Sequence, residues 1–127
     1  IPMCAFERSE KGMEFFMNKY EKWCEDLKKF WIDKDIDSII NLFDENVVYY
    51  ENPKMKIDSI NEVRKMWEEI KEQNTNNIEL KILCMDNNKC IANYILNDKI
   101  SYDMIYEIEL NGKNKCTYFK QWYMICE

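Results

Sequence analysis

The stretch that decides the fold runs from Lys34 to Pro53 and reads KDIDSIINLFDENVVYYENP. Asp35 suits a helix N-cap, because its carboxylate can accept hydrogen bonds from the first free backbone amides. The apolar residues that follow recur at the spacing of one helix face: Ile36, Ile39, Ile40 and Phe43. This pattern predicts a short helix over residues 35–43 with one buried face.

A strand is predicted directly after this helix. The polar residues 44–46 break the helical pattern, and Val47 to Tyr50 is a β-branched and aromatic run typical of a strand. Pro53 has no N–H to donate to a ladder of backbone hydrogen bonds, so we expect the strand to end near Asn52.

Two further helices are predicted on either side of this stretch. The first is long, because apolar residues keep helical spacing from Met13 to Trp31 while the opposite face is charged. The other begins at Ser59, which with Glu62 has the spacing of a capping box. Its apolar face ends near Ile70, where a polar run begins.

The second half of the chain has the two-residue period of strands. Apolar residues alternate with others over residues 78–85, 90–96, 102–110 and 116–125, and turn-forming residues separate these runs. Residues 54–58 are interpreted as a loop. The order helix, helix, strand, helix and four strands predicts an α+β fold, with three helices packed on a cone-shaped, curved antiparallel sheet.

Size and charge limit the function classes. A chain of 127 residues with 46% apolar content suits a single domain over residues 1–127, with residues 1–10 as a loose lead-in that shows no periodicity. No apolar run approaches the roughly 18 residues that a membrane-spanning helix needs, so we expect no membrane partner. The net charge of −6 disfavours a phosphate backbone, so we expect no nucleic acid partner.

The cysteines do not have the spacing of a metal site. There are six, none of them in a C-x-x-C pair, and the chain has no histidine to complete a mixed zinc site. We therefore expect no metal, and we expect no cofactor. Several cysteines lie within apolar patterns, where free thiols act as small hydrophobic side chains, and this favours a reducing, cytoplasmic location.

The stretch from Lys34 to Pro53, with Trp31 before it, resembles the nuclear transport factor 2-like (cystatin-like) superfamily, in particular its SnoaL-like and ketosteroid isomerase-like branches. In these proteins a helix with the pattern W-x-x-x-D-x-x-x-[IL] leads into F-x-E-[DN]-V-x-[YF]-x-[DN]-P. The resemblance extends over residues 13–125 and implies a cone with an apolar pocket. The matching residues are Trp31, Asp35, Ile39, Phe43, Glu45, Asn46, Val47, Tyr50, Asn52 and Pro53.

Strand alternation predicts which side chains enter this pocket. The acidic residues Asp103, Glu107 and Glu109 should face water, which turns their neighbours inward. In the first strand, placing Asn52 inward, as the resemblance implies, also turns Tyr50 inward. The predicted ligand-binding residues are Tyr20, Trp23, Leu27, Trp31, Tyr50, Asn52, Trp67, Tyr94, Tyr102, Met104, Tyr106 and Trp122.

The catalytic groups of ketosteroid isomerases are missing at the positions that the resemblance assigns to them. The general base position holds Asn52, the phenol position falls near Leu27, and the second acid position falls at Met104. Glu51 can replace the base only if the strand is shifted by one residue, which turns Tyr50 outward.

Other catalytic chemistries of the superfamily find little support. Those that depend on histidine are excluded, and Arg64, the only arginine besides Arg8, is expected on a helix surface. Cys24 or Cys84 in the pocket would lack a basic neighbour to activate the thiol.

The leading hypothesis is therefore that the pocket binds a small apolar or aromatic molecule without catalysis, with Asn52, Asn93 or tyrosine hydroxyls orienting it. Two alternatives stay open. One is an isomerase, cyclase or dehydratase that uses Glu51, and the other is a protein–protein association module.

A homodimer through the outer face of the sheet is also predicted. That face should carry apolar side chains too numerous to leave exposed to water. They are Leu83, Met85 and Ile105, with Phe119 or Tyr123 as further candidates.

Overall fold

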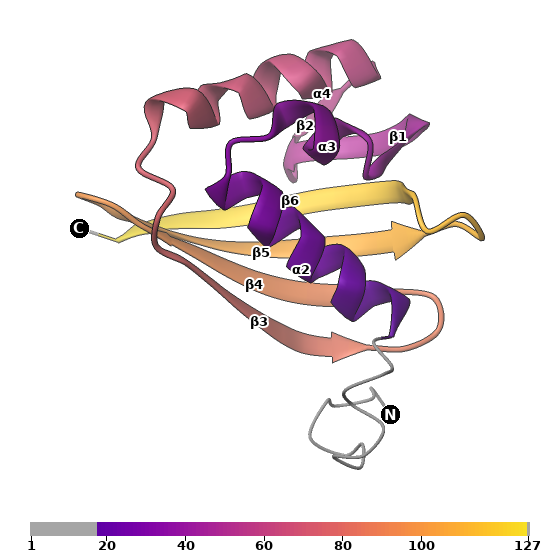
Figure 1. Cartoon of the computed structure of the whole chain (residues 1–127). Helices are drawn as coiled ribbons and strands as arrows, with labels where there is room; N and C mark the ends of the chain where they lie inside the picture. The colour runs from indigo at the N-terminus through magenta and orange to yellow at the C-terminus, as the bar shows by residue number, and fades with distance from the viewer. Residues whose placement is uncertain (1–17, 127) are drawn as a thin grey trace.

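The computed structural model describes residues 18–126. Three α-helices lie on one face of a curved, six-stranded sheet (Figure 1). The predicted lead-in over residues 1–10 and the predicted start of the first helix at Met13 lie outside the described residues.

Each α-helix begins at a side-chain cap. Helix α2 (Lys19–Ile32) starts with a reciprocal capping box between Asn18 and Glu21. Helix α3 (Ile36–Ile40) is capped by the predicted Asp35, whose carboxylate accepts from the Ser38 amide. Helix α4 (Ile60–Trp67) is capped by Ser59 and continues as the 3₁₀ helix η2 (Glu68–Glu72).

The sheet has the strand order β2-β1-β6-β5-β4-β3. Four of its strands agree closely with the predicted ones: β3 (Ile78–Met85), β4 (Cys90–Asn97), β5 (Ser101–Leu110) and β6 (Cys116–Cys126). They pair antiparallel, as predicted. Strand β1 (Phe43–Asn52) joins β6 in parallel, which the sequence did not predict.

Two predicted boundaries were wrong. Helix α3 ends at Ile40 rather than residue 43, and Phe43 is the first residue of β1. The predicted loop over residues 54–58 contains the short strand β2 (Met55–Ile57), which pairs antiparallel with β1. Pro53 does end β1 near Asn52, as expected.

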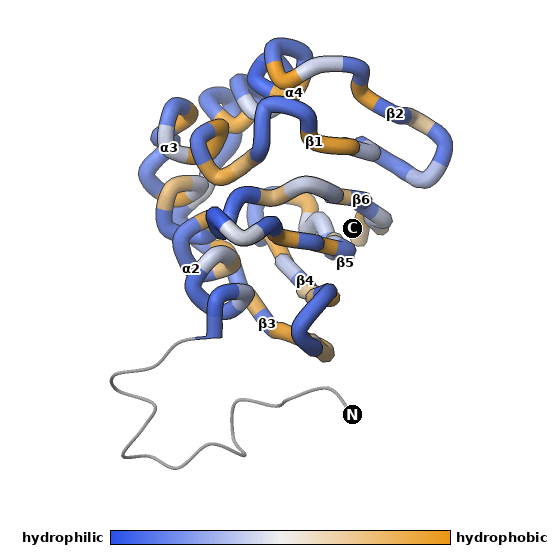
Figure 2. Tube along the Cα trace, turned by 90° about the vertical axis from the view of Figure 1, so that its right-hand side faces the viewer, coloured by the Kyte–Doolittle hydropathy of each residue, from blue (hydrophilic) through white to orange (hydrophobic). Residues whose placement is uncertain are grey.

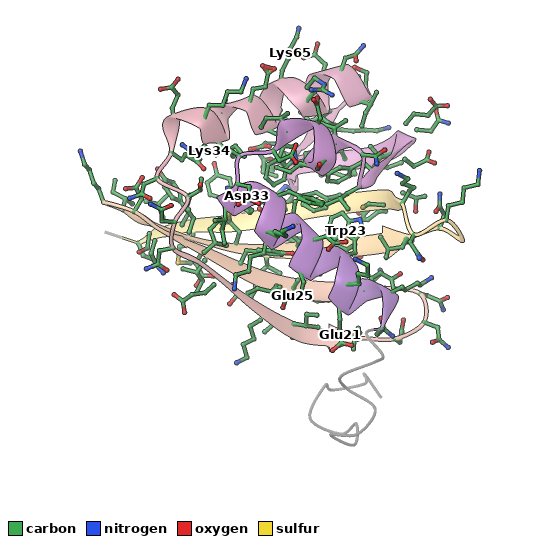
Figure 3. All side chains as sticks on the ribbon, viewed as in Figure 1. Glu21, Trp23, Glu25, Asp33, Lys34 and Lys65 are labelled. Atoms are coloured by element: carbon green, nitrogen blue, oxygen red, sulfur yellow. The ribbon has the colours of Figure 1, made fainter. Side chains whose placement is uncertain are left out.

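The core lies between the helices and the inner face of the sheet. Figure 2 shows the helices along one side of the strands, and charged side chains such as Lys65 project away from the sheet (Figure 3). Aromatic rings fill the core, where Tyr49 stacks on Phe119 at 4.8 Å and Tyr106 lies 4.5 Å from Phe119 (centroid distances). Such ring pairs add about 0.5–1.5 kcal/mol each beyond their buried area.

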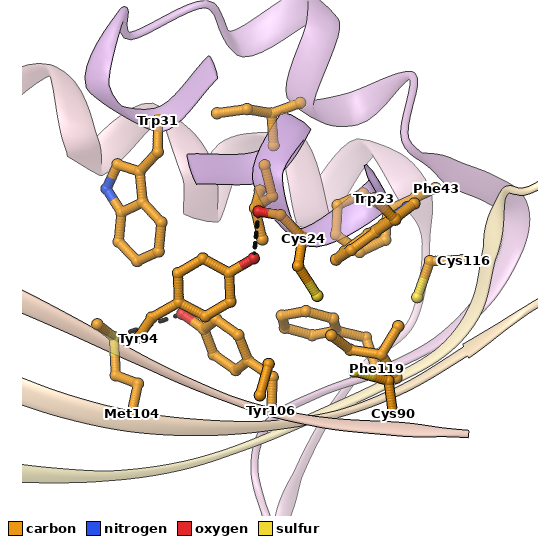
Figure 4. Close-up of a cluster of buried hydrophobic side chains, with 14 of the residues drawn as sticks. Trp23, Cys24, Trp31, Phe43, Cys90, Tyr94, Met104, Tyr106, Cys116 and Phe119 are labelled. Carbon is orange, nitrogen blue, oxygen red and sulfur yellow. Dashed lines mark hydrogen bonds between the residues drawn. The ribbon is translucent and has the colours of Figure 1, made fainter. Parts of the chain in front are cut away.

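Polar atoms of this core are tied to the backbone. The Tyr94 hydroxyl on β4 donates to the Cys24 carbonyl on α2 at 2.6 Å (Figure 4). The indole N–H of Trp23 donates to the Leu42 carbonyl at 2.9 Å. These bonds fasten helix α2 to the sheet and to the start of β1.

Irregularities in two strands change which residues face the core. A bulge between Ile82 and Cys84 turns Met85 inward, where it is buried, although Met85 was predicted on the outer face. Phe119, a second candidate for that face, is fully buried.

In the part of the chain that the structure describes, no helix is long and apolar enough to cross a membrane.

Candidate functional site

A cavity of about 180 Å³ lies between α4–η2 and the inner face of the sheet. An apolar cavity of roughly 150 Å³ can hold benzene, so this cavity has room for a molecule of one ring. Its walls come from α2, β1, α4, η2, β4, β5 and β6. They are formed by Trp31, Tyr49, Glu51, Met66, Trp67, Glu69, Ile70, Gln73, Leu96, Tyr102, Met104, Tyr106, Gln121 and Tyr123.

Strand β1 places a carboxylate in this cavity. Tyr49 is buried in the core, so Glu51, two residues further along β1, points to the same side and enters the cavity wall. The prediction that Tyr50 and Asn52 face inward was therefore wrong. Tyr50 packs beside Tyr118 instead, with a centroid distance of 6.1 Å, and the Asn52 side chain accepts from the Lys54 amide.

Five of the predicted ligand-binding residues do line the cavity: Trp31, Trp67, Tyr102, Met104 and Tyr106. Another four are buried in the core but do not line it: Tyr20, Trp23, Leu27 and Tyr94. Three of those four lie one or more turns before Trp31 on α2, at a rise of about 1.5 Å per residue, so they cover another part of the sheet.

Trp122 was also misplaced by the sequence prediction. In β6, Cys116 and Phe119 are both buried although an odd number of positions separates them, because the register with β5 shifts beside Leu110. Beyond this shift Gln121 and Tyr123 reach the cavity, and Trp122 is 39% exposed on the opposite face.

Glu51 has a strongly perturbed acidity. Burial is the larger cause and the nearby charge of Glu69 the smaller, and together they raise the pKa of its carboxyl to about 7. At neutral pH the side chain is therefore present in comparable amounts as acid and as base. A group with this pKa can both accept and return a proton.

Two phenols face the same carboxylate. Burial raises the pKa of Tyr106 well above its usual value, and the charge of Glu51 acts in the same direction. Burial likewise raises the pKa of Tyr49, with Tyr106 and Glu51 adding to it. Both hydroxyls therefore stay protonated at neutral pH. Among the described residues, the Tyr106 hydroxyl donates only to the Met104 sulfur, a weak acceptor at 3.4 Å (Figure 4).

Two tryptophans of the wall have buried indole nitrogens. Trp31 and Trp67 are 3% and 5% exposed, and neither indole nitrogen has a hydrogen-bond partner within residues 18–126. Trp67 lies close enough to the Tyr49 hydroxyl to lower its pKa, but the geometry is not that of a hydrogen bond. The Gln73 side-chain oxygen is also buried and unpaired among the described residues.

The cavity contains no basic side chain among its described lining residues. Arg64 instead pairs with the exposed Asp37 at 2.8 Å, which agrees with its predicted surface position. Neither Cys24 nor Cys84 lines the cavity. Over residues 18–126, no group of three or more cysteine, aspartate or glutamate side chains is placed to hold a metal ion.

Several lining residues were missed by the sequence analysis. Tyr49 was detectable, because Phe43, Val47 and Tyr49 alternate once residue 43 is assigned to the strand. The others are Met66, Glu69, Ile70, Gln73, Leu96, Gln121 and Tyr123. Met66 and Ile70 lie on the apolar face of the helix predicted from Ser59, but only three-dimensional packing brings them and the rest to the cavity.

No family model matches this sequence. No curated protein matches it either. Solved structures do, among them an NTF-2-like protein of unknown function from Burkholderia xenovorans LB400, with a TM-score of 0.69 and 13% identity over 83% of this chain and 82% of that one.

Two enzymes have similar structures. SalBIII, an epoxide hydrolase/cyclase-like enzyme of pyran ring formation in salinomycin, has a TM-score of 0.65 at 9% identity over 84% of this chain and 91% of its own. An LEH-like epoxide hydrolase from M. tuberculosis has a TM-score of 0.61 at 13% identity over 84% of this chain and 83% of its own. At these identities the similarity establishes the fold.

Proposed function

Because this chain has the nuclear transport factor 2-like fold, we propose that its cavity is the active site of an enzyme that moves a proton on a small cyclic carbonyl compound. The observation that carries the proposal is the position of Glu51 in the wall of an aromatic cavity with a pKa of about 7. A perturbed carboxyl in a cleft is a candidate catalytic group.

The proposed reaction is a 1,3-proton shift that converts a β,γ-unsaturated ketone into its conjugated isomer. The Glu51 carboxylate removes a proton from the carbon between the carbonyl and the double bond, and the electron pair moves onto the carbonyl oxygen. The protonated Glu51 then returns the proton to the far carbon of the former double bond. The enone is released and the carboxylate is regenerated.

A neutral donor is available for the negative charge that forms on the oxygen. The Tyr106 hydroxyl has only the weak Met104 sulfur as an acceptor among the described residues. Donors in a cavity largely screened from water stabilise an oxyanion more strongly than water does. A positioned base contributes typically about 10²–10⁴-fold in rate, and one oxyanion donor about 10²–10³-fold.

The direct test uses 3-cyclohexen-1-one, whose ring is close to the size of benzene, and follows the ultraviolet absorbance of the conjugated product. We expect kcat/KM to rise with pH through an apparent pKa near 7, because Glu51 must be ionised to act as the base. Glu51→Gln should lower kcat by at least about 10²-fold, since an amide cannot accept the proton.

A matched control is Glu45→Gln. It makes the same change of charge on the same strand, but Glu45 is exposed and does not line the cavity. We expect it to retain full activity. Turnover by wild type that Glu51→Gln does not reduce would contradict the proposal.

Binding without catalysis remains the second candidate. Met104 stands where the resemblance implies a second acid, and the Tyr106 hydroxyl is turned toward its sulfur. A binding protein needs neither a base nor an acid, so it would hold an enone and show no isomerisation at any pH. Three catalytic groups are missing at the positions that the resemblance assigns to them, and Glu51 in the cavity replaces only the base, while Leu27 and Met104 still stand at the other two positions.

A further inference from the structure

Glu51 lies at an irregular point of its strand. The pairs of β1 with β2 step from Tyr50 to Asn52, which is two residues along β1. On β2 the same step runs from Lys56 to Met55 and covers one residue. This is the pattern of a β-bulge with Glu51 as the extra residue, and bulges often redirect a side chain beside an active site. Regular pairing with β2 therefore does not fix the backbone of the proposed base.

On its other side Glu51 lies just past the last registered pair with β6. The parallel pairs of β1 and β6 end at Tyr50 and Lys120. At the next position of β6, the side-chain Nε2 of Gln121 donates to the Glu51 carbonyl at 3.0 Å. A carboxamide can donate to a carbonyl only through its nitrogen, so this bond also fixes which way the Gln121 amide faces. A side chain thus holds the backbone of the proposed base where the registered pairs end.

The same side chain lies beside the proposed oxyanion donor. Strand β6 lies between β1 and β5 (Figure 1), and Gln121 pairs in register with Tyr106 of β5. Neighbouring strands are about 4.7–4.9 Å apart, so Gln121 is one strand away from both Glu51 and Tyr106. All three residues line the cavity. Gln121 therefore connects the strand of the base with the strand of the donor.

We infer that Gln121 is a positioning residue: its bond to the Glu51 carbonyl fixes the backbone at the bulge and thereby holds the Glu51 carboxyl in the cavity wall. The inference rests on the proposed function, in which Glu51 is the base. Without this bond the end of β1 is free to shift, and the carboxyl can turn toward water. A misplacement of about 1 Å can cost about 10²-fold in rate, so the bond should affect catalysis as well as folding.

The first measurement is the acidity of Glu51, by NMR titration of its carboxyl carbon, with the signal assigned from its absence in Glu51→Gln. Gln121→Met keeps the length of the side chain without the donor, and Gln121→Asn keeps the amide but is one methylene shorter. In both variants the pKa of Glu51 should fall from about 7 toward 4.5, because a carboxyl that leaves the cavity regains water. We expect its acid dissociation constant to become at least about tenfold larger.

No titratable group of the cavity wall is changed in these variants. The second carboxyl of the wall belongs to Glu69 on η2. Among the described residues no basic side chain lines the cavity. The wall also contains four phenols, those of Tyr49, Tyr102, Tyr106 and Tyr123. A lower pKa of Glu51 in these variants therefore reports a change in the position of its own carboxyl.

The second measurement is the turnover of 3-cyclohexen-1-one. Both Gln121 variants should lower kcat by about 10–10²-fold and leave KM within about twofold, because the carboxylate acts on the bound ring rather than holding it.

Thr117→Val is the matched control. It removes a bond of the same kind, in which the Thr117 hydroxyl on β6 donates to the Glu109 carbonyl on β5 at 3.3 Å. Thr117 does not line the cavity. We expect this variant to keep both the pKa of Glu51 and the activity of wild type.

An unchanged pKa of Glu51 in both Gln121 variants would overturn the inference, because a loss of stability alone would show only a structural role. An equal fall of this pKa in Thr117→Val would also overturn it. Failure of the proposed function is seen separately. In that case the pKa of Glu51 would fall in both Gln121 variants, but the wild-type protein would not turn over 3-cyclohexen-1-one.

Discussion

The indole rings of Trp31 and Trp67 meet edge to face, with centroids 5.0 Å apart and planes at 88°, and both rings line the cavity. Trp31 also lies 5.9 Å from Tyr94, the residue that ties β4 to α2. The cavity wall is therefore continuous with the packed core. Its aromatic rings are held in place by the same contacts that stabilise the fold.

The first prediction concerns stability and pH. The pKa of Glu51 is raised from 4.5 to about 7 in the folded state, so the folded protein binds a proton that the unfolded chain releases between these values. The free energy of unfolding should therefore fall as pH rises from about 4.5 through about 7. Glu51→Gln should raise Tm at pH 8 and have little effect at pH 4.5, measured by circular dichroism. A larger increase in Tm at pH 4.5 than at pH 8 would contradict the burial of the Glu51 carboxyl.

The second prediction concerns Glu69. Its charge contributes to the raised pKa of Glu51, after burial, so Glu69→Gln should move the apparent pKa of the cavity downward. The measurement is the pH dependence of kcat/KM or, without turnover, of benzaldehyde binding. Glu72→Gln is the control, because Glu72 is exposed on η2 and does not line the cavity. An unchanged profile in Glu69→Gln would show that the two carboxylates do not interact.

The third prediction concerns the link between α2 and the sheet. Tyr94→Phe removes the 2.6 Å bond to the Cys24 carbonyl and should lower the free energy of unfolding by about 0.5–1.5 kcal/mol. Tyr123→Phe changes a tyrosine that is 51% exposed and should stay within about 0.5 kcal/mol of wild type. Urea unfolding measures both. If both variants lower the free energy of unfolding by the same amount, the buried hydrogen bond of Tyr94 contributes no stability beyond the packing of its ring.

The fourth prediction is a homodimer through the outer face of the sheet. Trp122 and Met124 are 39% and 67% exposed on this face, and Trp122 pairs in register with the half-buried Ile105. Light scattering at micromolar concentration should give twice the 15.6 kDa of one chain. Trp122→Lys should yield monomers, whereas Met55→Lys, at an exposed site on β2, should not. A wild-type protein of 15.6 kDa would rule out this dimer.

The fifth prediction concerns the thiols. All six cysteines should react with a thiol reagent in denaturant without reductant, as expected in a reducing compartment such as the cytoplasm. In the folded protein Cys126 should react quickly, because it is exposed. Cys24, Cys90 and Cys116 should react only on unfolding, because they are buried. Fewer than six thiols in denaturant would reveal a disulfide.

Local patterns were enough for most of the architecture. The caps at Asp35 and Ser59, the stop at Pro53 and the four late strands were readable because each depends on neighbours a few residues apart. Five cavity residues were also found, because their strands and helices have one clearly apolar face.

Which face of β1 and of β6 is buried depends on tertiary contacts rather than on local sequence patterns. Both strands are apolar or aromatic on two faces, so alternation alone does not say which face is buried. In the structure the parallel pairing of β1 with β6 sets Tyr49 opposite Phe119, and these rings stack in the core. The stacking of Tyr49 on Phe119 turns Glu51 inward and Tyr50 outward. A shift of β1 by one residue would instead turn Tyr50 inward and Glu51 outward.

The sequence by itself therefore determined the α+β fold and its element order, because helix and strand periods, caps and turns are local properties of the chain. Only the tertiary structure decided that the cavity has a carboxylate rather than an amide. Glu51 and Asn52 are adjacent in β1. Which of the two side chains faces the cavity depends on the pairing of Tyr49 with Phe119, about 70 positions further along the chain. The pKa of Glu51 depends in turn on burial beneath α4 and η2 and on Glu69, which no local pattern records.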